Sequence, residues 1–419
     1  MIRPYALPFI LLVLTACNVA DADKWGGTIT DSAGVAIVTN PAQGDWSVAP
    51  QPQVTKDLDI GTVEGEAAYQ FGAIASIDVN DAGEILVLDQ QAAQVRVFDA
   101  TGKHLRSIGR PGGGPGELTP GQTLVGMRAG RGDTVYVADL GSFRIVGFAG
   151  DGTEFGSYPI PLAQGIPVIM RPAPGGKLAI QMRRMALPGI TDSTVTPRDF
   201  IIIRDLAAST ADTVATLESG ETLQFGKGGK LQTRIFSSEP VWTVLDDGRI
   251  VIGRNDRYSF QVFSPDGTLE RVISRPAVPV PVTAADQQAY RSVMRKLVGE
   301  QLASSGGAES PATIAYVDRM MKDMQFAEYF PVYANLMAGP DNTLWVQHFP
   351  NIAATLESAE PDLQNLTSPD WDVFDSQGRL LGAVTLPERF NGVRAAGNAI
   401  YGVQRDELDV QHVVRLTVH

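Results

Sequence analysis

A pair of short strands recurs six times along this chain of 419 residues, and the recurrence constrains the fold more than any other feature. In the first copy, the alternating apolar run Ile85–Asp89 is followed by a second run at residues 95–99 and a turn at residues 101–102. Short runs rich in β-branched and aromatic residues, bounded by Gly, Asp and Asn, are typical of antiparallel strands. One such unit cannot bury both faces of its own sheet, so the copies must stack around a common axis.

When the copies are aligned, both strands of the pair recur at regular positions. The first strand is named strand b and the second is named strand c. Strand b recurs at residues 135–139, 178–182, 250–254, 344–348 and 400–404. Strand c recurs at residues 144–148, 200–203, 260–263, 371–374 and 413–416. With an inner strand a and an outer strand d added to each pair, the chain is predicted to be an all-β, six-bladed β-propeller.

The sixth copy runs out of chain after its strand c, because the sequence ends at His419. Its outer strand is most simply supplied by the N-terminal region, from residues 58–61 or from residues 34–38. An N-terminal strand that completes the last blade joins the two ends of the ring and hides its sheet edges. We therefore predict this closure.

The second copy carries a more specific pattern. Asp139 is followed five residues later by Arg144 and Ile145, then by Phe148, with Gly152 in the next turn. This spacing resembles the NHL-repeat family of six-bladed β-propellers, closely over residues 72–160 and by architecture elsewhere. The stretch at residues 108–117 also resembles a segment of bacterial lipoproteins that contain six-bladed propellers. Both resemblances imply the fold and leave the activity open.

Charge limits the partners of this protein. The chain has 47 acidic and 34 basic residues, a formal net charge of -13, and no stripe of Lys or Arg. An acidic surface repels nucleic acid, so we expect no nucleic-acid partner. Partners that are neutral, cationic or peptide-like fit the charge better, and we expect a monomer.

The only cysteine, Cys17, lies directly after an apolar run at residues 5–14 that is too short to span a membrane. Together with Leu14 and Ala16, it resembles the lipobox of bacterial lipoproteins, which implies cleavage before Cys17 and acylation of that residue. An ordinary signal peptide cut near Ala16 or Ala20 is the alternative. Several acyl chains would hold the mature protein on its membrane, and Asn18 in the second mature position permits sorting to the outer membrane.

The domain organisation follows from these assignments. Residues 1–17 are interpreted as the lipoprotein signal peptide, residues 18–33 as a flexible tether, and residues 34–419 as one propeller. We expect an extracytoplasmic protein, anchored through lipid to the outer membrane in a Gram-negative cell.

Loop lengths distinguish the two faces of the predicted propeller. In each blade, the b-to-c loops and the connections from strand d to the next strand a share one face, and the a-to-b and c-to-d turns share the other. The long segments are residues 111–122, 183–198, 219–240, 276–330 and 349–370, and all belong to the first face. Long loops in a compact domain usually carry function, so we predict that this long-loop face binds the ligand.

The ends of strand b place several polar residues on this face. The candidates for ligand binding are Arg254, His348, Gln404, Asp89 and Asp139. For Asp89 and Asp139, capping of the b-to-c turn is the alternative interpretation. A helical hairpin is predicted at about residues 282–328, between blades four and five, from a capping box at residues 283–286 and two apolar stripes. These stripes either pack against the propeller or recognise a partner.

No catalytic constellation is evident in the sequence. No pair among the four histidines has zinc-ligand spacing, and no G-x-S-x-G motif occurs. Some six-bladed propellers hold calcium in the central channel, so calcium is a possible cofactor. Weak candidates for its ligands are Glu64, Asn255, Asp256 and Asn351.

These observations predict a binding protein rather than an enzyme. We expect a membrane-anchored propeller that binds or scaffolds an envelope protein, a peptide or a small ligand through its long-loop face. The alternative is an NHL-like, calcium-dependent hydrolase, lactonase or lyase with its site in the central channel. A structural module that docks through the helical hairpin is a third hypothesis.

Overall fold

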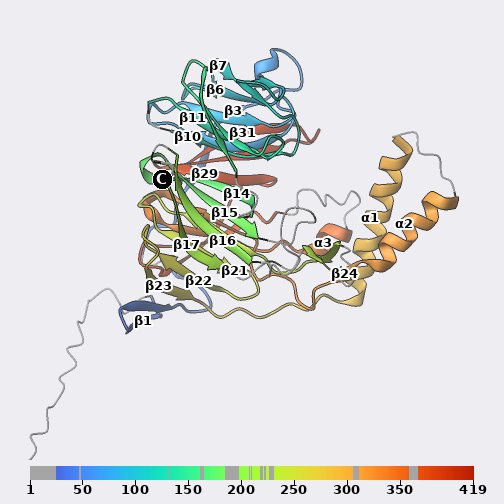
Figure 1. Cartoon of the computed structure of the whole chain (residues 1–419). Helices are drawn as coiled ribbons and strands as arrows, with labels where there is room; N and C mark the ends of the chain where they lie inside the picture. The colour runs from blue at the N-terminus through green and yellow to red at the C-terminus, as the bar shows by residue number, and fades with distance from the viewer. Residues whose placement is uncertain are drawn as a thin grey trace, which may run out of the picture.

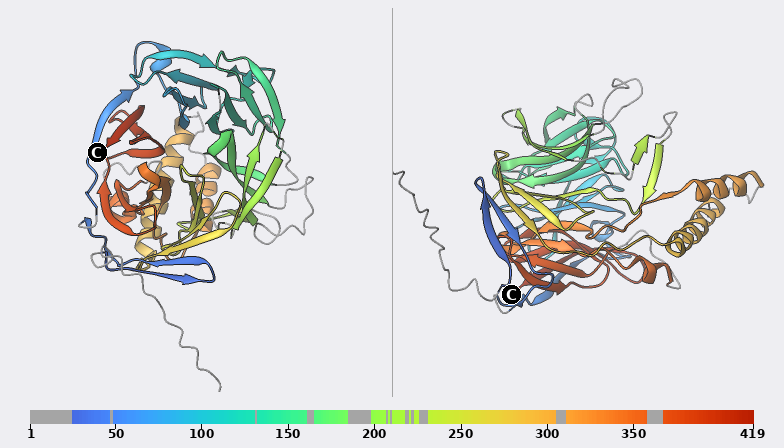
Figure 2. Two further views of the ribbon diagram at one scale, coloured as in Figure 1. Left: turned by 90° about the vertical axis from the view of Figure 1, so that its left-hand side faces the viewer. Right: turned by 90° about the horizontal axis from the view of Figure 1, so that it is seen from below.

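Six antiparallel sheets are arranged as blades around one axis, which confirms the predicted six-bladed β-propeller (Figure 1; Figure 2, left). The structure is a computed structural model that describes residues 25–46, 49–130, 132–160, 165–184, 198–206, 208, 210–217, 220, 223–225, 231–304, 311–357 and 367–419. Each blade runs from an inner strand a to an outer strand d.

Each blade consists of four strands in the order a, b, c, d. Blade one consists of β4 (Ile74–Val79), β5 (Ile85–Asp89), β6 (Gln94–Phe98) and β7 (His104–Ile108). Blade two consists of β10 (Leu124–Ala129), β11 (Val135–Asp139), β12 (Arg144–Phe148) and β13 (Glu154–Pro159). Blade three consists of β14 (Ile166–Ala173), β15 (Lys177–Arg184), β16 (Arg198–Asp205) and β17 (Thr210–Leu217). Blade four consists of β20 (Pro240–Val244), β21 (Ile250–Arg254), β22 (Ser259–Phe263) and β23 (Leu269–Ser274). Blade five consists of β25 (Asn335–Ala338), β26 (Leu344–Gln347), β27 (Asp370–Phe374) and β28 (Leu380–Thr385). Blade six consists of β29 (Phe390–Ala396), β30 (Ala399–Arg405), β31 (Gln411–Val418) and β3 (Val54–Ile60).

The remaining elements lie in the connections between strands. They are β8 (Arg110–Pro111), β9 (Glu117–Leu118), β18 (Leu223–Phe225), β19 (Leu231–Ile235), β24 (Gln325–Phe326), α1 (Ala284–Ser304), α2 (Pro311–Asp323), α3 (Ile352–Glu357) and short 3-10 turns at Ala67–Tyr69, Pro174–Gly176 and Pro340–Asn342. None of the helices in the described part of the chain is long and apolar enough to cross a membrane.

The ring closes through the N-terminal region, as predicted. Strand β3 pairs with β31 as the outer strand of blade six, with Ile60 opposite Val413. Of the two segments considered for this role, the one at residues 58–61 therefore performs it.

The other segment has a different place. Strand β2 (Val35–Thr39) pairs in parallel with β23 on the outer edge of blade four, and β1 (Thr28–Ser32) forms a hairpin with β2. The hairpin turn is formed by Ala33 and Gly34, both with positive φ, which suits a tight two-residue turn. Because β1 lies within residues 18–33, the prediction of a flexible tether over that whole range is wrong: strand pairing orders its second half.

The core lies between neighbouring blades. The aromatic residue at the end of strand c is fully buried in blades one, two and five, as Phe98, Phe148 and Phe374. Trp242 and Trp345, on strands a and b, are also buried. These side chains fill the wedges between blades and explain why the repeat keeps an aromatic residue at that position.

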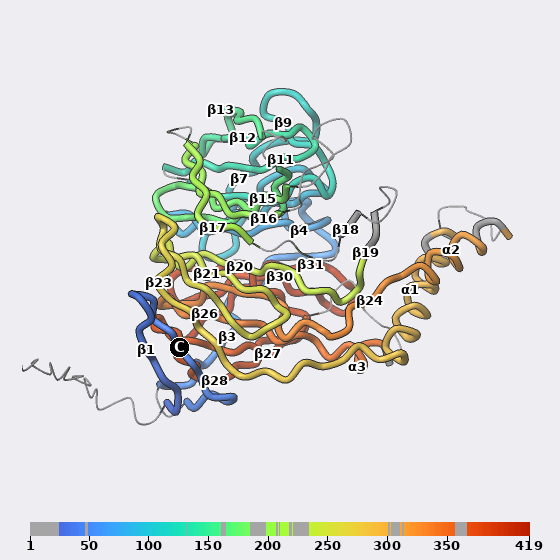
Figure 3. The backbone as a smooth tube through the Cα atoms, turned by 60° about the horizontal axis from the view of Figure 1, so that its bottom comes forward, coloured from blue at the N-terminus to red at the C-terminus, as the bar shows by residue number. Residues whose placement is uncertain are grey.

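The helices share one end of the propeller with the long connections. Helices α1 and α2 belong to the connection between blades four and five, α3 belongs to the b-to-c loop of blade five, and all three lie on the side opposite β1 (Figures 1 and 3). The predicted capping box is confirmed, because Thr283 and Asp286 bond to each other at the start of α1. Residues 185–197 of one predicted long loop lie outside the described residues.

Candidate ligand-binding pocket

A pocket of about 660 Å³ opens on the long-loop face between blades four and five. Its residues come from the b-to-c loops of both blades and from the connection that carries α1, so only loops of the predicted working face contribute. The residues that form its polar end and its apolar walls include Tyr258, Arg275, Val278, Val280, Phe330, His348, Phe349 and Ile352. The volume lies in the range of sites for small organic ligands.

A buried carboxylate, Asp372, lies behind the polar end of this pocket. It belongs to β27, and its side chain is only 4% exposed. Arg275 Nη1 lies 2.8 Å from Asp372 Oδ2, and His348 Nε2 lies 3.0 Å from Asp372 Oδ1. The Tyr258 hydroxyl donates a hydrogen bond to Oδ2. Asp372 thus joins three side chains from three separate loops.

These contacts set the charge state of the group. Burial raises the pKa of the Asp372 carboxyl, but the contacts with His348, Arg275 and Tyr258 outweigh it and leave the pKa below its ordinary value. Burial, together with the Asp372 charge, raises the pKa of Tyr258 well above its ordinary value. Asp372 is therefore a carboxylate and Tyr258 a neutral phenol that donates to it.

Backbone pairing and ring stacking hold the two loop residues in position. His348 directly follows β26, and its N–H donates to the carbonyl of Asp370 on the neighbouring strand at 2.9 Å. The Arg275 guanidinium carbon lies 4.3 Å from the centre of the Tyr258 ring, a cation–π contact. The side chain of His348 is 37% exposed, compared with 18% for Arg275. A ligand in the pocket therefore meets the imidazole first.

The walls of the pocket are apolar. Val278 is 86% exposed and Val280 is 57% exposed, which is unusual for valines in a protein with a large core. The rings of Phe330 and Phe349 lie 5.9 Å apart on another side. An apolar surface that flanks a small polar group favours a ligand with an apolar body and a polar end.

Among the predicted site residues, His348 reaches this pocket, and Arg254 and Gln404 lie elsewhere. Arg254 Nε lies 3.3 Å from Asp256, and its Nη2 donates to Ser238 at 3.2 Å, so it is held within blade four. Gln404 accepts a hydrogen bond from Lys56 at 3.1 Å and donates to the Glu388 carbonyl at 3.0 Å.

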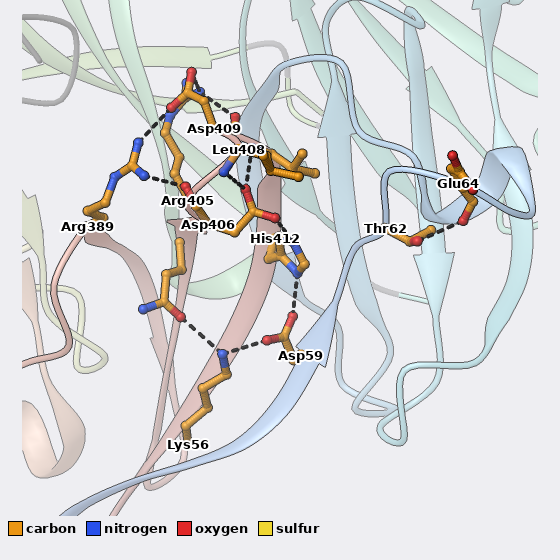
Figure 4. Close-up of polar contacts among 12 residues, drawn as sticks. Lys56, Asp59, Thr62, Glu64, Arg389, Arg405, Asp406, Leu408, Asp409 and His412 are labelled. Carbon is orange, nitrogen blue, oxygen red and sulfur yellow. Dashed lines mark hydrogen bonds and ion pairs between the residues drawn. The ribbon is translucent and has the colours of Figure 1, made fainter. Parts of the chain in front are cut away.

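Gln404 therefore belongs to a polar cluster on blade six. There His412 Nδ1 lies 2.7 Å from Asp59, and Arg389 and Arg405 both contact Asp409 (Figure 4). The contacts of Asp59 with His412 and of Lys56 with Gln404 join the closing strand β3 to its neighbours. The cluster helps to stabilise the closure, and two of its members, Arg389 and Arg405, also line a smaller pocket of about 190 Å³.

Asp89 and Asp139 both lie fully buried at the ends of their strands. Asp89 accepts hydrogen bonds from four backbone N–H groups in the adjoining loops and pairs with Arg96 at 3.2 Å. Asp139 accepts bonds from the N–H and hydroxyl groups of Thr119 and Ser142. This geometry favours the turn-capping interpretation for both residues.

The residues named as weak calcium candidates do not converge. The Asn255 side chain accepts the N–H of Glu239, Asp256 pairs with Arg254, and Asn351 accepts an N–H in the first turn of α3. Glu64 lies in the connection before blade one, where its carbonyl accepts a bond from Thr62 (Figure 4). Across the part of the chain that the structure describes, no three His, Cys, Asp or Glu side chains are grouped to hold a metal ion.

The three residues that form the polar group with His348 were not predicted from the sequence. Asp372 gave no signal, because it falls on the polar phase of the alternating strand Asp370–Phe374, where an exposed charge is expected. Tyr258 and Arg275 gave none either, since they lie in loops and only the folded ring brings them to Asp372.

Fold and pocket together define a six-bladed β-propeller with a well-formed pocket on its long-loop face, and known proteins agree with the fold. Residues 63–122 match a family described as "6-bladed beta-propeller". No curated protein matches the sequence.

Solved structures share this architecture. A Bacteroides fragilis protein described as exported superposes with a TM-score of 0.51 at 9% identity, over 91% of this chain and 99% of that one. Virginiamycin B lyase from Staphylococcus aureus gives 0.44 at 9% identity, over 88% and 99%. A gluconolactonase from Xanthomonas campestris gives 0.42 at 11% identity, over 94% and 100%. At 9% identity, the similarity to the Bacteroides fragilis protein shows the fold alone.

Proposed function

We propose that this protein binds a ligand with an apolar body and a hydrogen-bonding end in the pocket between blades four and five. A small molecule and an apolar peptide segment both meet this description. The observation that carries the proposal is Asp372, a buried carboxylate that orders Tyr258, Arg275 and His348 behind a pocket with apolar walls.

The polar end of the pocket sets a preference for the head group. At the polar end, the charges of Arg275 and Asp372 balance, and the groups available to a ligand are the donors of Arg275 and one ring nitrogen of His348. The pocket has a further carboxylate, Asp286, which accepts the N–H and hydroxyl of Thr283 at the start of α1. Beside Arg275 and His348, a hydroxyl or carboxylate therefore fits better than an ammonium group.

Melting temperatures measured with decanol, decanoate and decylamine below their micellar concentrations test this preference. The three probes share one apolar body and differ in the head group. We expect decanol and decanoate to raise the melting temperature and decylamine to have a smaller effect. If all three probes shifted the melting temperature equally, and His348→Ala left those shifts unaltered, the polar end of the pocket would have no role in binding.

We also propose that the mature protein is anchored to its membrane through lipid on Cys17. The support is the lipobox-like sequence, since Cys17 lies outside the described residues. Expression of Cys17→Ser tests it: we expect a soluble protein, and unchanged retention in membranes would contradict the anchor.

Acid–base catalysis at the same pocket is a second candidate function. The observation that favours it is the contact between His348 and the buried carboxylate of Asp372, the arrangement that stabilises an imidazolium during proton transfer. In ester hydrolysis, neutral His348 would accept a proton from the attacking water and pass it to the departing alkoxide. Hydrolysis of p-nitrophenyl butyrate that is lost in His348→Gln would support catalysis, and an equal rate in both proteins would exclude it.

The calcium-dependent hydrolase or lyase predicted from sequence stays a separate prediction. A rise in melting temperature of several degrees on addition of calcium, reversed by a chelator, would support it. Pull-down from solubilised membranes, with and without residues 283–326, tests the docking role of α1 and α2.

A further inference from the structure

Trp25, near the N-terminus, is fixed to the short-turn face of the propeller, opposite the pocket. It is only 5% exposed and packs in one core cluster with Leu245 and Leu380. Leu245 precedes the a-to-b turn of blade four, and Leu380 follows the c-to-d turn of blade five. Both turns lie on the short-turn face, and Asn40, which bonds to Trp25, also bonds to Gly378 and Leu380 at the second turn. Trp25 therefore lies on that face.

A set of hydrogen bonds around Asn40 holds this residue in place. Trp25 Nε1 donates to Asn40 Oδ1 at 3.1 Å, and the N–H of Leu380 donates to the same oxygen at 2.6 Å. Asn40 Nδ2 donates in turn to the carbonyls of Gly378 at 3.0 Å and Ser274 at 3.2 Å. Trp25 is thus fastened to blades four and five, and β1 extends along the same side (Figures 1 and 3).

We infer that the lipid anchor turns the short-turn face towards the membrane, so that the pocket opens away from the bilayer. This inference rests on the anchor proposed at Cys17. Only residues 18–24 separate Cys17 from Trp25, and a chain of this length reaches about 28 Å when fully extended. The point of attachment at Trp25 therefore stays within that distance of the acylated cysteine.

The height of the propeller then separates the pocket from the lipid. A strand of five or six residues is about 17–20 Å long, and the pocket lies beyond the far ends of β21 and β26. The ligand therefore enters from the aqueous compartment, free or presented by a partner on that side, and not from the bilayer that carries the protein.

Two positions in blade five provide a matched test. Ser376 is exposed in the c-to-d turn, and Ala354 is exposed in α3 at the opposite end of the same blade. The lipidated full chain, with either Ser376→Cys or Ala354→Cys, offers a single free thiol because its only natural cysteine carries the lipid. Each variant is labelled with a donor dye and reconstituted in vesicles that contain a fluorescent acceptor lipid.

We expect the acceptor to quench the dye at Ser376→Cys about twofold more than at Ala354→Cys, because the two sites differ in height by at least one strand length. Equal quenching, or stronger quenching at Ala354→Cys, would overturn the orientation. If neither protein floats with the vesicles, the anchor itself fails, whereas ligand binding in the pocket is unaffected by either result. Melting temperatures of the labelled proteins control for misfolding.

Discussion

Two buried carboxylates have different kinds of hydrogen-bond partners. Asp89 in blade one and Asp372 in blade five are both nearly inaccessible and both pair with an arginine. The partners of Asp89 are mostly backbone N–H groups of the adjoining loops. The partners of Asp372 are side chains from three loops, and one of them, His348, is open to a pocket.

The difference suggests a test: the burial of Asp89 should serve stability alone, and that of Asp372 should also serve the proposed pocket. A carboxylate that accepts hydrogen bonds from nearby backbone N–H groups stabilises a turn. The same contact is available to every blade that keeps the repeat. A carboxylate that orders distant side chains at a cavity costs desolvation in order to fix their geometry. Variants of the two residues should therefore separate stability from binding.

Asp89→Ala should have the largest effect on stability. The change leaves Arg96 and four N–H groups without their acceptor, and we expect a loss of about 3–5 kcal/mol in the free energy of unfolding. Urea denaturation measures it. Asp81→Ala, at an exposed position in the same blade, is the control and should leave the midpoint nearly unchanged. Binding of ligand by the folded fraction of Asp89→Ala should be normal.

Asp372→Asn should reduce both stability and ligand affinity. We expect the free energy of unfolding to fall by about 2–4 kcal/mol, because Arg275 keeps an uncompensated charge. We also expect weaker binding in the pocket. Isothermal titration calorimetry with decanoate measures the change in affinity. Full affinity in a folded Asp372→Asn protein would remove the contrast between the two carboxylates, since Asp372 would then be as structural as Asp89.

The contribution of Asp372 should also depend on pH. Its pKa is lower in the folded protein than the value of about 3.9 expected in the unfolded chain. The stabilisation is therefore present above about pH 4 and is lost as the pH falls through the lower folded value. The difference in unfolding free energy between wild type and Asp372→Asn should shrink from pH 7 to pH 3.

Tyr258→Phe should have an intermediate effect. It removes one donor to the Asp372 carboxylate, and hydrogen bonds to charged groups contribute about 1.5–3 kcal/mol. Tyr333→Phe is a matched control, because the Tyr333 hydroxyl is buried and has no hydrogen-bond partner among the described residues. Its loss should leave the unfolding free energy unchanged or slightly higher. Equal losses in both variants would show that the Asp372 contact adds nothing.

Gln404→Ala should have the smallest effect. Gln404 bonds to Lys56 and to the Glu388 carbonyl near the surface of blade six, so we expect a stability change within about 0.5 kcal/mol. Decanoate affinity should stay within twofold of wild type. A large loss of affinity would contradict a site between blades four and five and would favour one on blade six.

The sequence predicts the repeated parts of this fold and the residues that depend on them. Strands b and c could be placed because their period-two pattern and terminal aromatic residues, such as Phe98 and Phe374, are local properties of the chain. His348 was found because it follows strand b. Both 34–38 and 58–61 have strand-like sequences, so the choice between them required the packed structure.

The rest of the site depends on contacts that no local pattern contains. Tyr258 and Arg275 reach Asp372 across 114 and 97 residues of sequence, because blades four and five pack side by side. Asp89 and Asp139 had the more conspicuous sequence positions, yet the same local turns that made them conspicuous also satisfy their carboxylates.

A fluorescence titration with anilinonaphthalene sulfonate reports directly on ligand binding between blades four and five. Val280 lies in the pocket wall and is 57% exposed, whereas Val63, in the connection before blade one, is 54% exposed. Asp substitutions at these two valines therefore change equally accessible side chains. We predict that Val280→Asp abolishes binding of the probe to the folded protein and that Val63→Asp leaves it intact. Equal binding by both variants would contradict a binding pocket at this position.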